Sequence, residues 1–218
     1  MDLWATWLDS IGSMLTLLSS GAGLGLGLAI VVATVLLRIV LLPLAWPIAY
    51  RACLRQKKMA KLQPELQALR DRFRDQPELY LDKMRELYRA HDLALVDAKS
   101  FLGSLVQLPV FLGMYQVLRN AGDGARFLWV ANLLRPDVAL ALIAGLATAL
   151  MMAVNPDMPE QLRIVMIVVP SILAIVAALQ FSSALAVYWA TSNTFSALQT
   201  VLLHVIVRRR ARSGAIQI

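Results

Sequence analysis

Arg38 is the residue whose chemistry most needs an explanation, because it lies inside a strongly apolar run over residues 24–45. A run of this length can cross a bilayer, which takes about 20 residues. A guanidinium keeps its charge at any ordinary pH, and placing it in hydrocarbon costs at least about 2.5 kcal/mol. Arg38 must therefore reach the lipid head groups, pair with another group or line a hydrated cavity.

Other polar side chains lie in apolar stretches later in the chain. Gln107 falls within residues 101–118, and the last stretch carries a polar helical face of Ser192, Ser196 and Gln199 beside a stripe of Trp189, Asn193 and Thr200. At a rise of ~1.5 Å per residue, Arg38 lies roughly 10 Å from the inner end of its stretch, and Gln107 lies at a similar depth. No Asp or Glu lies in the interior of a stretch, so the sequence offers Arg38 no carboxylate there.

These residues leave two interpretations of Arg38 open. A hydrated cavity open toward the cytoplasm would solvate the guanidinium, whereas a long Arg side chain at this depth could also snorkel to the head groups. Ser and Asn in membrane helices also commonly join neighbouring helices by hydrogen bonds. Depth alone does not separate a functional cavity from structural polar contacts.

Composition identifies the class of protein that must hold these residues. Hydrophobic residues make up 59% of the 218 residues and charged residues only 16%, with a mean hydropathy of +0.64. Soluble domains carry about 25% charged residues, so the chain is predicted to be an integral membrane protein. Its single cysteine, Cys53, excludes an internal disulfide and a cysteine-cluster metal site.

The apolar stretches predict an all-α membrane protein with five transmembrane helices, at 24–45, 101–118, 137–154, 162–180 and 183–207. Basic residues set the orientation. Residues 51–99 contain twelve Lys and Arg and the tail 208–218 contains four, against three in 119–136 and none in 1–23. We expect one membrane domain over 1–218, with the N-terminus outside and the C-terminus cytoplasmic. The net charge of +7 then reflects topology, and no DNA partner is expected.

Residues 3–18 place apolar side chains at helical spacing, with Asp9, Ser10 and Ser13 between them. This pattern predicts an amphipathic helix on the outer membrane surface, with Trp4 and Trp7 at the interface. The alternative is an extension of the first span, from which a glycine-rich stretch over 21–27 separates it. No basic region precedes the apolar residues, so no cleavable signal peptide is expected.

Residues 51–99 predict a cytoplasmic helical hairpin. Apolar residues recur at the intervals of an antiparallel coiled-coil seam at Met59, Leu62, Leu66, Leu69 and Phe73. Residues 75–78 form a stop-and-restart signal, and a second apolar face follows at Leu81, Met84, Leu87 and Tyr88. Pro64 predicts either a kink or the first turn of a helix. The periodicity supports an amphipathic connector and a docking platform for a substrate or a ribosome equally.

The order of these features resembles the YidC/Oxa/Alb membrane protein insertases over about residues 20–207. The matching elements are Arg38, Pro43-Leu44, KMAKLQPE at 58–65, MRELY at 84–88, QLPVF at 107–111, Tyr115, Tyr188-Trp189, Ser192-Asn193 and Gln199. Each short motif is weak alone, but their order and spacing make the set fairly specific.

The resemblance implies five helices around a hydrophilic groove that is open to the cytoplasm and to lipid and closed toward the outside. It places Arg38 in this groove, which would be lined by Gln107, Trp189, Ser192 and Asn193. It also implies that 51–99 is a mobile hairpin and 3–18 the outer amphipathic helix. The expected function is insertion of nascent membrane proteins into a bacterial plasma membrane. Expected partners are these clients and membrane lipids, with the ribosome and the Sec translocon as candidates.

Two departures from the family pattern favour an alternative. Residues 91–105 contain neither the Asn-Pro pair nor the Gly-Cys-Leu-Pro element that usually precedes the Gln of the second span. The chain also shows no large extracytoplasmic domain and only a short basic tail. The alternative function is a membrane scaffold or assembly factor that keeps the insertase fold without translocating a client.

A transporter or an intramembrane enzyme is the third class considered. No acidic residue lies in a span interior for ion coupling or aspartyl chemistry, and the chain has no P-loop. Neither His91 nor His204 lies in an HExxH motif, and Cys53 has no obvious base. We interpret His204 as a residue at the membrane interface, near the inner end of the last stretch. We therefore expect no enzyme activity, catalytic residue, metal site or cofactor.

Overall fold

A computed structural model describes residues 2–91, 93, 107–119, 121, 124–155, 158 and 160–213. Within these ranges the chain is helical, with one isolated β-bridge. The elements are α1 (Leu3–Thr16), the π-helix η1 (Leu17–Gly21), α2 (Leu26–Arg72), α3 (Pro77–Ala90), α5 (Gln107–Arg119), α6 (Val138–Ala153), α7 (Glu160–Gln180) and α8 (Ser183–Arg212). The prediction of an all-α protein is confirmed.

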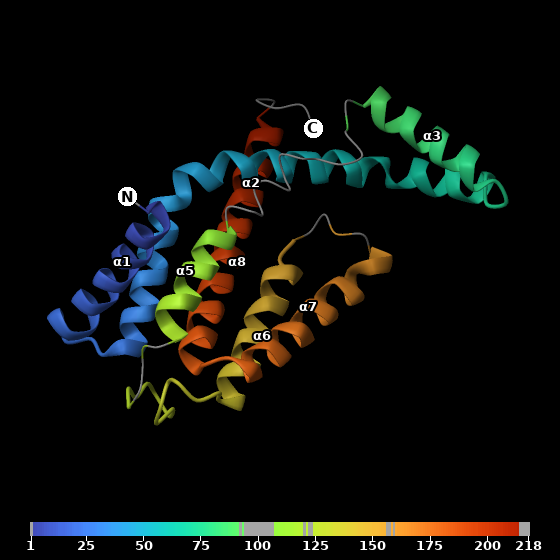
Figure 1. Ribbon diagram of the computed structural model, residues 1–218. Helices are drawn as coiled ribbons and strands as arrows, with labels where there is room; N and C mark the ends of the chain where they lie inside the picture. Colours follow the sequence, from blue (N-terminus) through green and yellow to red (C-terminus); the bar gives the residue numbers. More distant parts are fainter. Residues whose placement is uncertain are drawn as a thin grey trace.

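The 47-residue helix α2 joins two elements that were predicted to be separate. It contains the predicted span 24–45 from Leu26 onward and continues into the first arm of the predicted hairpin. Figure 1 shows α2 changing direction between its apolar and charged halves, the part of the sequence that holds Pro43 and Pro47. Proline removes a helical hydrogen bond and bends a helix without necessarily ending it. Pro64 also lies inside α2, so it does not mark a helix start.

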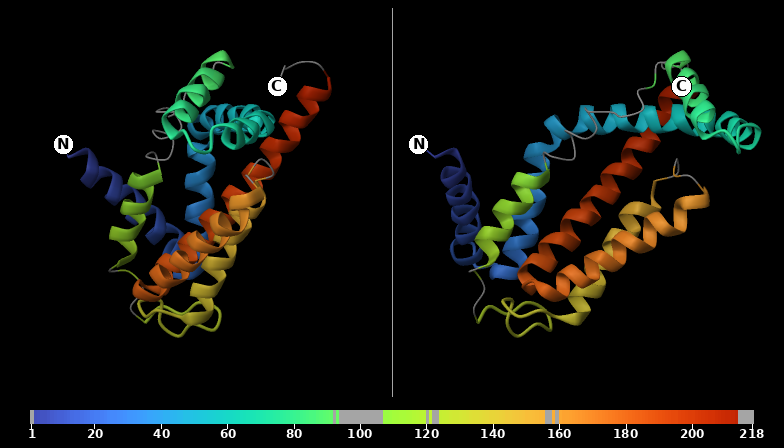
Figure 2. Two further views of the ribbon diagram at one scale, coloured as in Figure 1. Left: turned by 90° about the vertical axis from the view of Figure 1, so that its right-hand side faces the viewer. Right: turned by 45° about the vertical axis from the view of Figure 1, so that its right-hand side comes forward.

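Helix α8 lies between two groups of helices (Figure 2). On one side it packs against α2 and α5, and on the other against α6, which also packs along α7. The α6–α7 contact is close, since a Cβ added to Gly145 would lie 2.3 Å from Ile175 Cγ1. The largest buried side chains between these helices include Tyr188, Ile30, Met114, Leu118 and Leu185.

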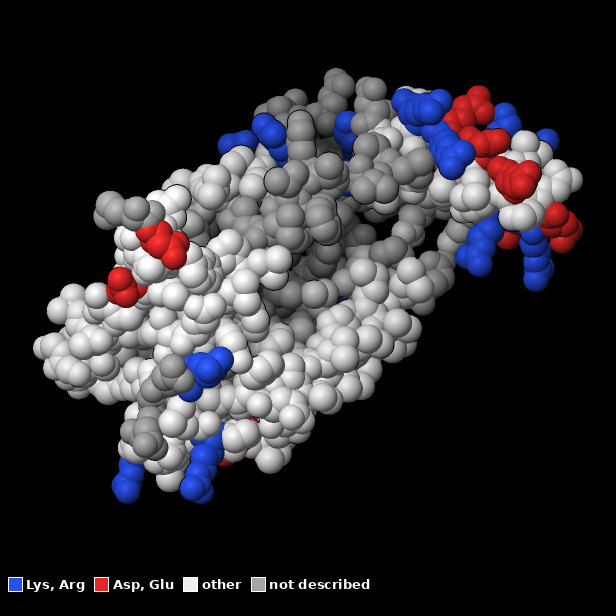
Figure 3. Space-filling view, in the orientation of Figure 1, with Lys and Arg blue, Asp and Glu red and all other residues white. Residues whose placement is uncertain are grey.

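Among the described residues, two helices are long and apolar enough to cross a membrane: α2 and the part of α7 from Leu162 to Gln180. Helix α6 is apolar but shorter. Residues 101–106 of the predicted second span lie outside the described residues. Charged side chains gather over the second half of α2 and over α3, with a few at the opposite end and a largely uncharged surface between (Figure 3). This pattern fits a membrane protein, and the five-span arrangement stays a prediction.

Helix α1 is a separate helix that packs across α5. The indole Nε1 of Trp7 donates to the carbonyl oxygen of Pro109 at 3.2 Å, and Nε1 of Trp4 donates to Oε1 of Gln116 at 3.3 Å. The chain changes direction before α2 begins, through the π-helix η1 and the positive φ angles of Gly23 and Gly25. An extension of the first span is therefore wrong for residues 3–18, whose position at the outer membrane surface stays a prediction.

Helices α2 and α3 form a hairpin in which α3 turns back along the end of α2 (Figure 1). Leu62 is buried, and the other predicted seam residues of α2 are half-buried: Met59, Leu66, Leu69 and Phe73. On α3, Met84, Leu87 and Tyr88 are half-buried, whereas Leu81 is exposed. Of the predicted hairpin, residue 92 and residues 94–99 lie outside the described residues.

Gly27 and Gly12 provide a matched test of helix packing. A Cβ on Gly27 would lie 2.1 Å from Cγ of Phe127, so Gly27→Ala must displace that ring. We expect Gly27→Ala to lower the free energy of unfolding by about 1–3 kcal/mol, the usual cost of overpacking. Gly12 has nothing within 4 Å of an added Cβ, so Gly12→Ala is expected to be neutral or to stabilise by roughly 0.5–1 kcal/mol. Thermal unfolding in detergent compares the two, and equal effects would contradict the contact.

Candidate functional site

Small side chains bring α2 and α8 together around Arg38. Ala29 and Ala33 of α2 and Ala184 and Ala186 of α8 are all buried in the same apolar core. Small residues let membrane helices approach closely, so polar groups farther along the two helices come within reach of each other. Arg38 on α2 and Ser192 on α8 are such a pair, although 154 residues separate them.

The guanidinium of Arg38 donates a hydrogen bond from Nη2 to the Oγ of Ser192, which is only 4% exposed. Tyr188, one turn before Ser192 on α8, is also buried, and its ring lies 6.4 Å from that of Phe111 on α5, between centroids. Nε of Arg38 is buried without a hydrogen-bond partner in the described part of the chain, where Arg38 also forms no ion pair. A guanidinium carries five N–H donors. Arg38 is therefore a fixed positive charge whose donors are only partly used.

The other predicted site residues have different neighbours. Trp189 packs edge-on against Phe111 of α5, with ring centroids 5.9 Å apart and an interplanar angle of 74°. Asn193 points toward α6, where its Nδ2 donates to Oγ1 of Thr148 at 2.8 Å. Gln107 is the first residue of α5, and its side chain lies outside the described part of the structure. Arg38 and Ser192 thus meet directly, whereas Trp189 and Asn193 contact flanking helices.

Most hydroxyl groups of the apolar helices described here are satisfied within their own helices. Each donates to the carbonyl oxygen four residues earlier, at 2.6–3.0 Å, in Thr34, Thr148, Ser171, Thr191, Thr194 and Ser196. Such groups need no partner on another helix. Ser196, predicted on the polar face of Ser192, is thus tied back to the Ser192 carbonyl.

Thr148 and Tyr188 carry contacts of the site that the polar-residue pattern of the sequence did not assign. Thr148 is buried on α6 and accepts from Asn193. One feature of the sequence could have identified Thr148: it is the only hydroxyl residue in the stretch 137–154. The sequence named Tyr188 only as part of the Tyr188-Trp189 motif, because an aromatic residue in an apolar span does not show which helix it packs against.

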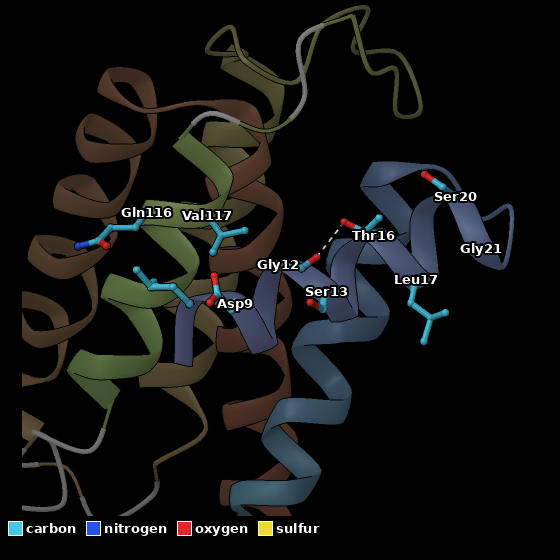
Figure 4. Close-up of a pocket in the computed structure, with 10 residues that line it drawn as sticks. Asp9, Gly12, Ser13, Thr16, Leu17, Ser20, Gly21, Gln116 and Val117 are labelled. Atoms are coloured by element: carbon cyan, nitrogen blue, oxygen red, sulfur yellow. Dashed lines mark hydrogen bonds between the residues drawn. The ribbon is translucent and has the colours of Figure 1, made fainter. Parts of the chain in front are cut away.

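A separate pocket of about 1090 Å³ lies between α1, η1 and α5 (Figure 4). Asp9, Ser13, Thr16, Ser20 and Gln116 supply its polar groups, and Leu8, Leu17 and Val117 supply apolar ones. Neither Arg38 nor Ser192 lines this pocket. In the described part of the chain, no three His, Cys, Asp or Glu side chains come together as metal ligands.

On the hairpin, ion pairs lie on the surface. Nζ of Lys83 donates to Oε2 of Glu86 at 2.8 Å, and this hydrogen bond lowers the pKa of Glu86. Nη1 of Arg85 lies 3.2 Å from Oδ1 of Asp82. Burial raises the pKa of Tyr88, Tyr80 adds to this effect and Arg55 opposes it. Exposed ion pairs contribute little to stability, so these two pairs add little to the free energy of unfolding of the hairpin.

Comparison with known proteins gives one consistent family. The sequence model described as 60Kd inner membrane protein matches residues 17–210. "Membrane protein insertase YidC 2" of Staphylococcus epidermidis is 30% identical over 193 residues, which cover 81% of this chain and 66% of that protein. The Staphylococcus haemolyticus "Membrane protein insertase YidC" is 31% identical over 191 residues, covering 81% and 65%. The Helicobacter pylori protein of that name is 26% identical over 186 residues, covering 83% and 34%. The chain thus spans just under two thirds of the staphylococcal relatives and about a third of the Helicobacter one.

The Asn193–Thr148 hydrogen bond predicts an energetic coupling between α8 and α6. In a double-mutant cycle with Asn193→Ala and Thr148→Val, we expect a coupling energy of about 0.6 kcal/mol, the average for such bonds in membranes. Reversible unfolding in mixed micelles measures it. The control cycle pairs Thr148→Val with Thr194→Val, because Thr194 bonds only to its own helix. Coupling of equal size in both cycles would contradict the assigned contact.

Proposed function

Since this chain belongs to the 60Kd inner membrane protein family, we propose that it is an insertase that moves hydrophilic segments of nascent membrane proteins into the bacterial inner membrane. Its curated relatives carry the name membrane protein insertase. The observation that carries the proposal is the state of Arg38. Its guanidinium lies at the contact of α2 and α8 with one hydrogen bond to Ser192, a buried Nε without a partner in the described ranges and no paired carboxylate there.

The proposed groove contains Arg38 and Ser192, with Gln107, Trp189 and Asn193 at its sides. Acidic residues in a client's tail are attracted to Arg38, since two charges about 4 Å apart interact by about 4 kcal/mol at an effective dielectric of ~20. A carboxylate fits a guanidinium with free donors because the two can form paired hydrogen bonds. Arg38 thus offsets part of the cost of bringing acidic residues below the head groups.

The driving force proposed for insertion is the transfer of the client's apolar helix into lipid. This transfer contributes ~25 cal/mol per Å² of apolar surface removed from water. The chain's own residues then only lower the barrier for the polar segment that must cross, and no nucleotide hydrolysis enters the scheme. The hairpin of α2 and α3 faces the cytoplasm in this proposal, where it meets the client and, as candidates, a ribosome and the Sec translocon.

A scaffold that holds a partner without translocating it is the second candidate. Asn193 favours it, because its amide is engaged by Thr148 in helix packing and is not free for a client. The absence of the Asn-Pro and Gly-Cys-Leu-Pro elements from residues 91–105 points the same way. Expression in cells depleted of their own insertase separates the two, because only a translocating protein restores growth and client insertion.

Arg38 provides the direct test of the insertase proposal. We expect Arg38→Ala to reduce translocation of a client tail rich in Asp and Glu by roughly tenfold, which corresponds to ~1.4 kcal/mol. A client with an uncharged tail of equal length should be much less affected, because it gains nothing from the charge. Protease protection of the tail in proteoliposomes measures both. Arg163→Ala is the matched control, since Arg163 is an exposed arginine of α7. Unchanged insertion of the acidic tail in Arg38→Ala would overturn this role.

Cysteine accessibility tests whether the site around Arg38 and Ser192 is hydrated. In a Cys53→Ala background, Ser192→Cys and Gln107→Cys should react with a membrane-impermeant thiol reagent from the cytoplasm and not from outside. Apolar surroundings raise the pKa of a thiol and keep it unreactive, so labelling requires a hydrated site. Thr194→Cys is the control on the same helix, because Thr194 is on the exposed side of α8. It should stay unlabelled in lipid. Protection of Ser192→Cys from both sides would mean a packed polar contact and would favour the scaffold.

A further inference from the structure

A tight turn at residues 127–130 displays two large apolar side chains at its tip. The backbone N–H of Phe127 donates to the carbonyl of Val130 at 3.0 Å, and the N–H of Val130 donates back to Phe127 at 2.8 Å. Leu128 and Trp129 occupy the central positions, and Leu128 has a φ of +52°. Such positions normally take Gly or Asn, and a left-handed conformation costs other residues about 1–2 kcal/mol. The sequence thus places a strained leucine where a small polar residue would fit better in water.

Two side chains of the turn point into the protein and two point outward. Val130 is buried, and Phe127 is half-buried and packs against Gly27. Leu128 is 71% exposed and Trp129 is 54% exposed. In the described part of the chain, packing covers less than half of the surface of each of these two side chains. Removal of both side chains from water by another surface would supply about 25 cal/mol per Å² of apolar area.

The tip is held in a fixed position relative to two helices. The indole Nε1 of Trp129 donates to Oδ1 of Asp137 at 3.1 Å, and the same oxygen caps the start of α6 by accepting from the N–H of Leu140. Past the turn, the carbonyls of Leu133 and Arg135 accept from the first N–H groups of α8, at Ala184 and Ser183. These bonds fix the loop to the starts of α6 and α8, so the outward direction of Leu128 and Trp129 is built in.

The level of the tip identifies the surface that covers it. Asp137 immediately precedes the apolar helix α6, whose exposed residues begin at Val138 and include Leu146, which is 70% exposed. The turn lies at the end of the bundle opposite α3 (Figure 1). Tryptophan concentrates where an apolar helix surface meets water at a membrane, with its N–H toward the polar side. Arg126 is exposed beside the turn, where it can approach head-group phosphates.

We infer that the turn at 127–130 is a lipid anchor that inserts Leu128 and Trp129 into the bilayer leaflet opposite the hairpin. The covering surface is phospholipid: acyl chains against Leu128, the interface around Trp129 and phosphate near Arg126. The inference rests on the membrane location of the helices and not on insertase activity. The anchor fixes the depth of the outer ends of α6 and α8.

Quenching of Trp129 by lipid tests this inference in the full chain reconstituted in vesicles of phosphatidylcholine and phosphatidylglycerol. The spectrum of Trp129→Phe is subtracted from that of the unchanged protein to isolate Trp129 emission. In vesicles with brominated acyl chains, we expect this difference spectrum to lose most of its intensity, while aqueous iodide leaves it nearly unchanged. The reverse result, quenching by iodide and not by bromine, would place the tip in water and overturn the inference.

A labelled cysteine gives an independent measurement that does not alter Trp129. In the Cys53→Ala background, a fluorophore on Leu128→Cys should lose more emission to spin-labelled lipid than to iodide. The matched control is a fluorophore on Gln76→Cys, at the exposed turn between α2 and α3, which should show the opposite ratio. If the label at Leu128→Cys is shielded from both quenchers, a protein surface covers the tip and the lipid assignment is wrong.

Discussion

A polar group inside a bilayer must find its hydrogen-bond partner within the protein, and this constraint organises the helices described here. In the spans, most hydroxyl side chains donate to a carbonyl of their own helix, as Thr34 and Ser171 do. These residues place no demand on neighbouring helices. Arg38 and Asn193 cannot be satisfied in this way, and each has a partner on another helix, Ser192 and Thr148 respectively. The two contacts tie α8 to α2 on one side and to α6 on the other, so α8 occupies the centre of the arrangement.

The same helix meets α2 a second time beyond the apolar region. Leu203 and Val207 of α8 bury Cys53, and Arg210 lies over the ring of Tyr50 at 5.7 Å. A polar contact at Arg38 and an apolar contact at Cys53 therefore fix α2 against α8 at two levels. At the other end of α8, backbone carbonyls of the 133–135 loop cap its first turn. The helix that carries Ser192 is thus restrained along its whole length, which holds the Ser192 hydroxyl in place for Arg38.

The sequence predicted the helical class and most helix positions because long apolar runs have few other solutions in a membrane. The bounds of α6 and α7 differ from the predicted stretches by a residue or two. The continuity of α2 was not predictable, since Pro43 and Pro47 can end a helix or bend one, and tertiary contacts decide between them. Periodicity placed Ser192 and Asn193 on adjoining stripes but could not show which helix faces each stripe. The turn at 127–130 was not predicted, because its central residues are not the Gly or Asn that usually indicates such a turn.

The continuity of α2 through its bend also has a mechanical consequence. From Pro47 to Arg72 the helix extends for ~25 residues, or roughly 38 Å at 1.5 Å per residue. An arm of that length amplifies small rotations, so a 10° change at the bend moves its far end by about 7 Å, roughly the rise of five helical residues. The arm packs on α8 through Cys53 close to the bend. A force applied at the tip of the hairpin therefore acts on the same two helices that hold Arg38 against Ser192.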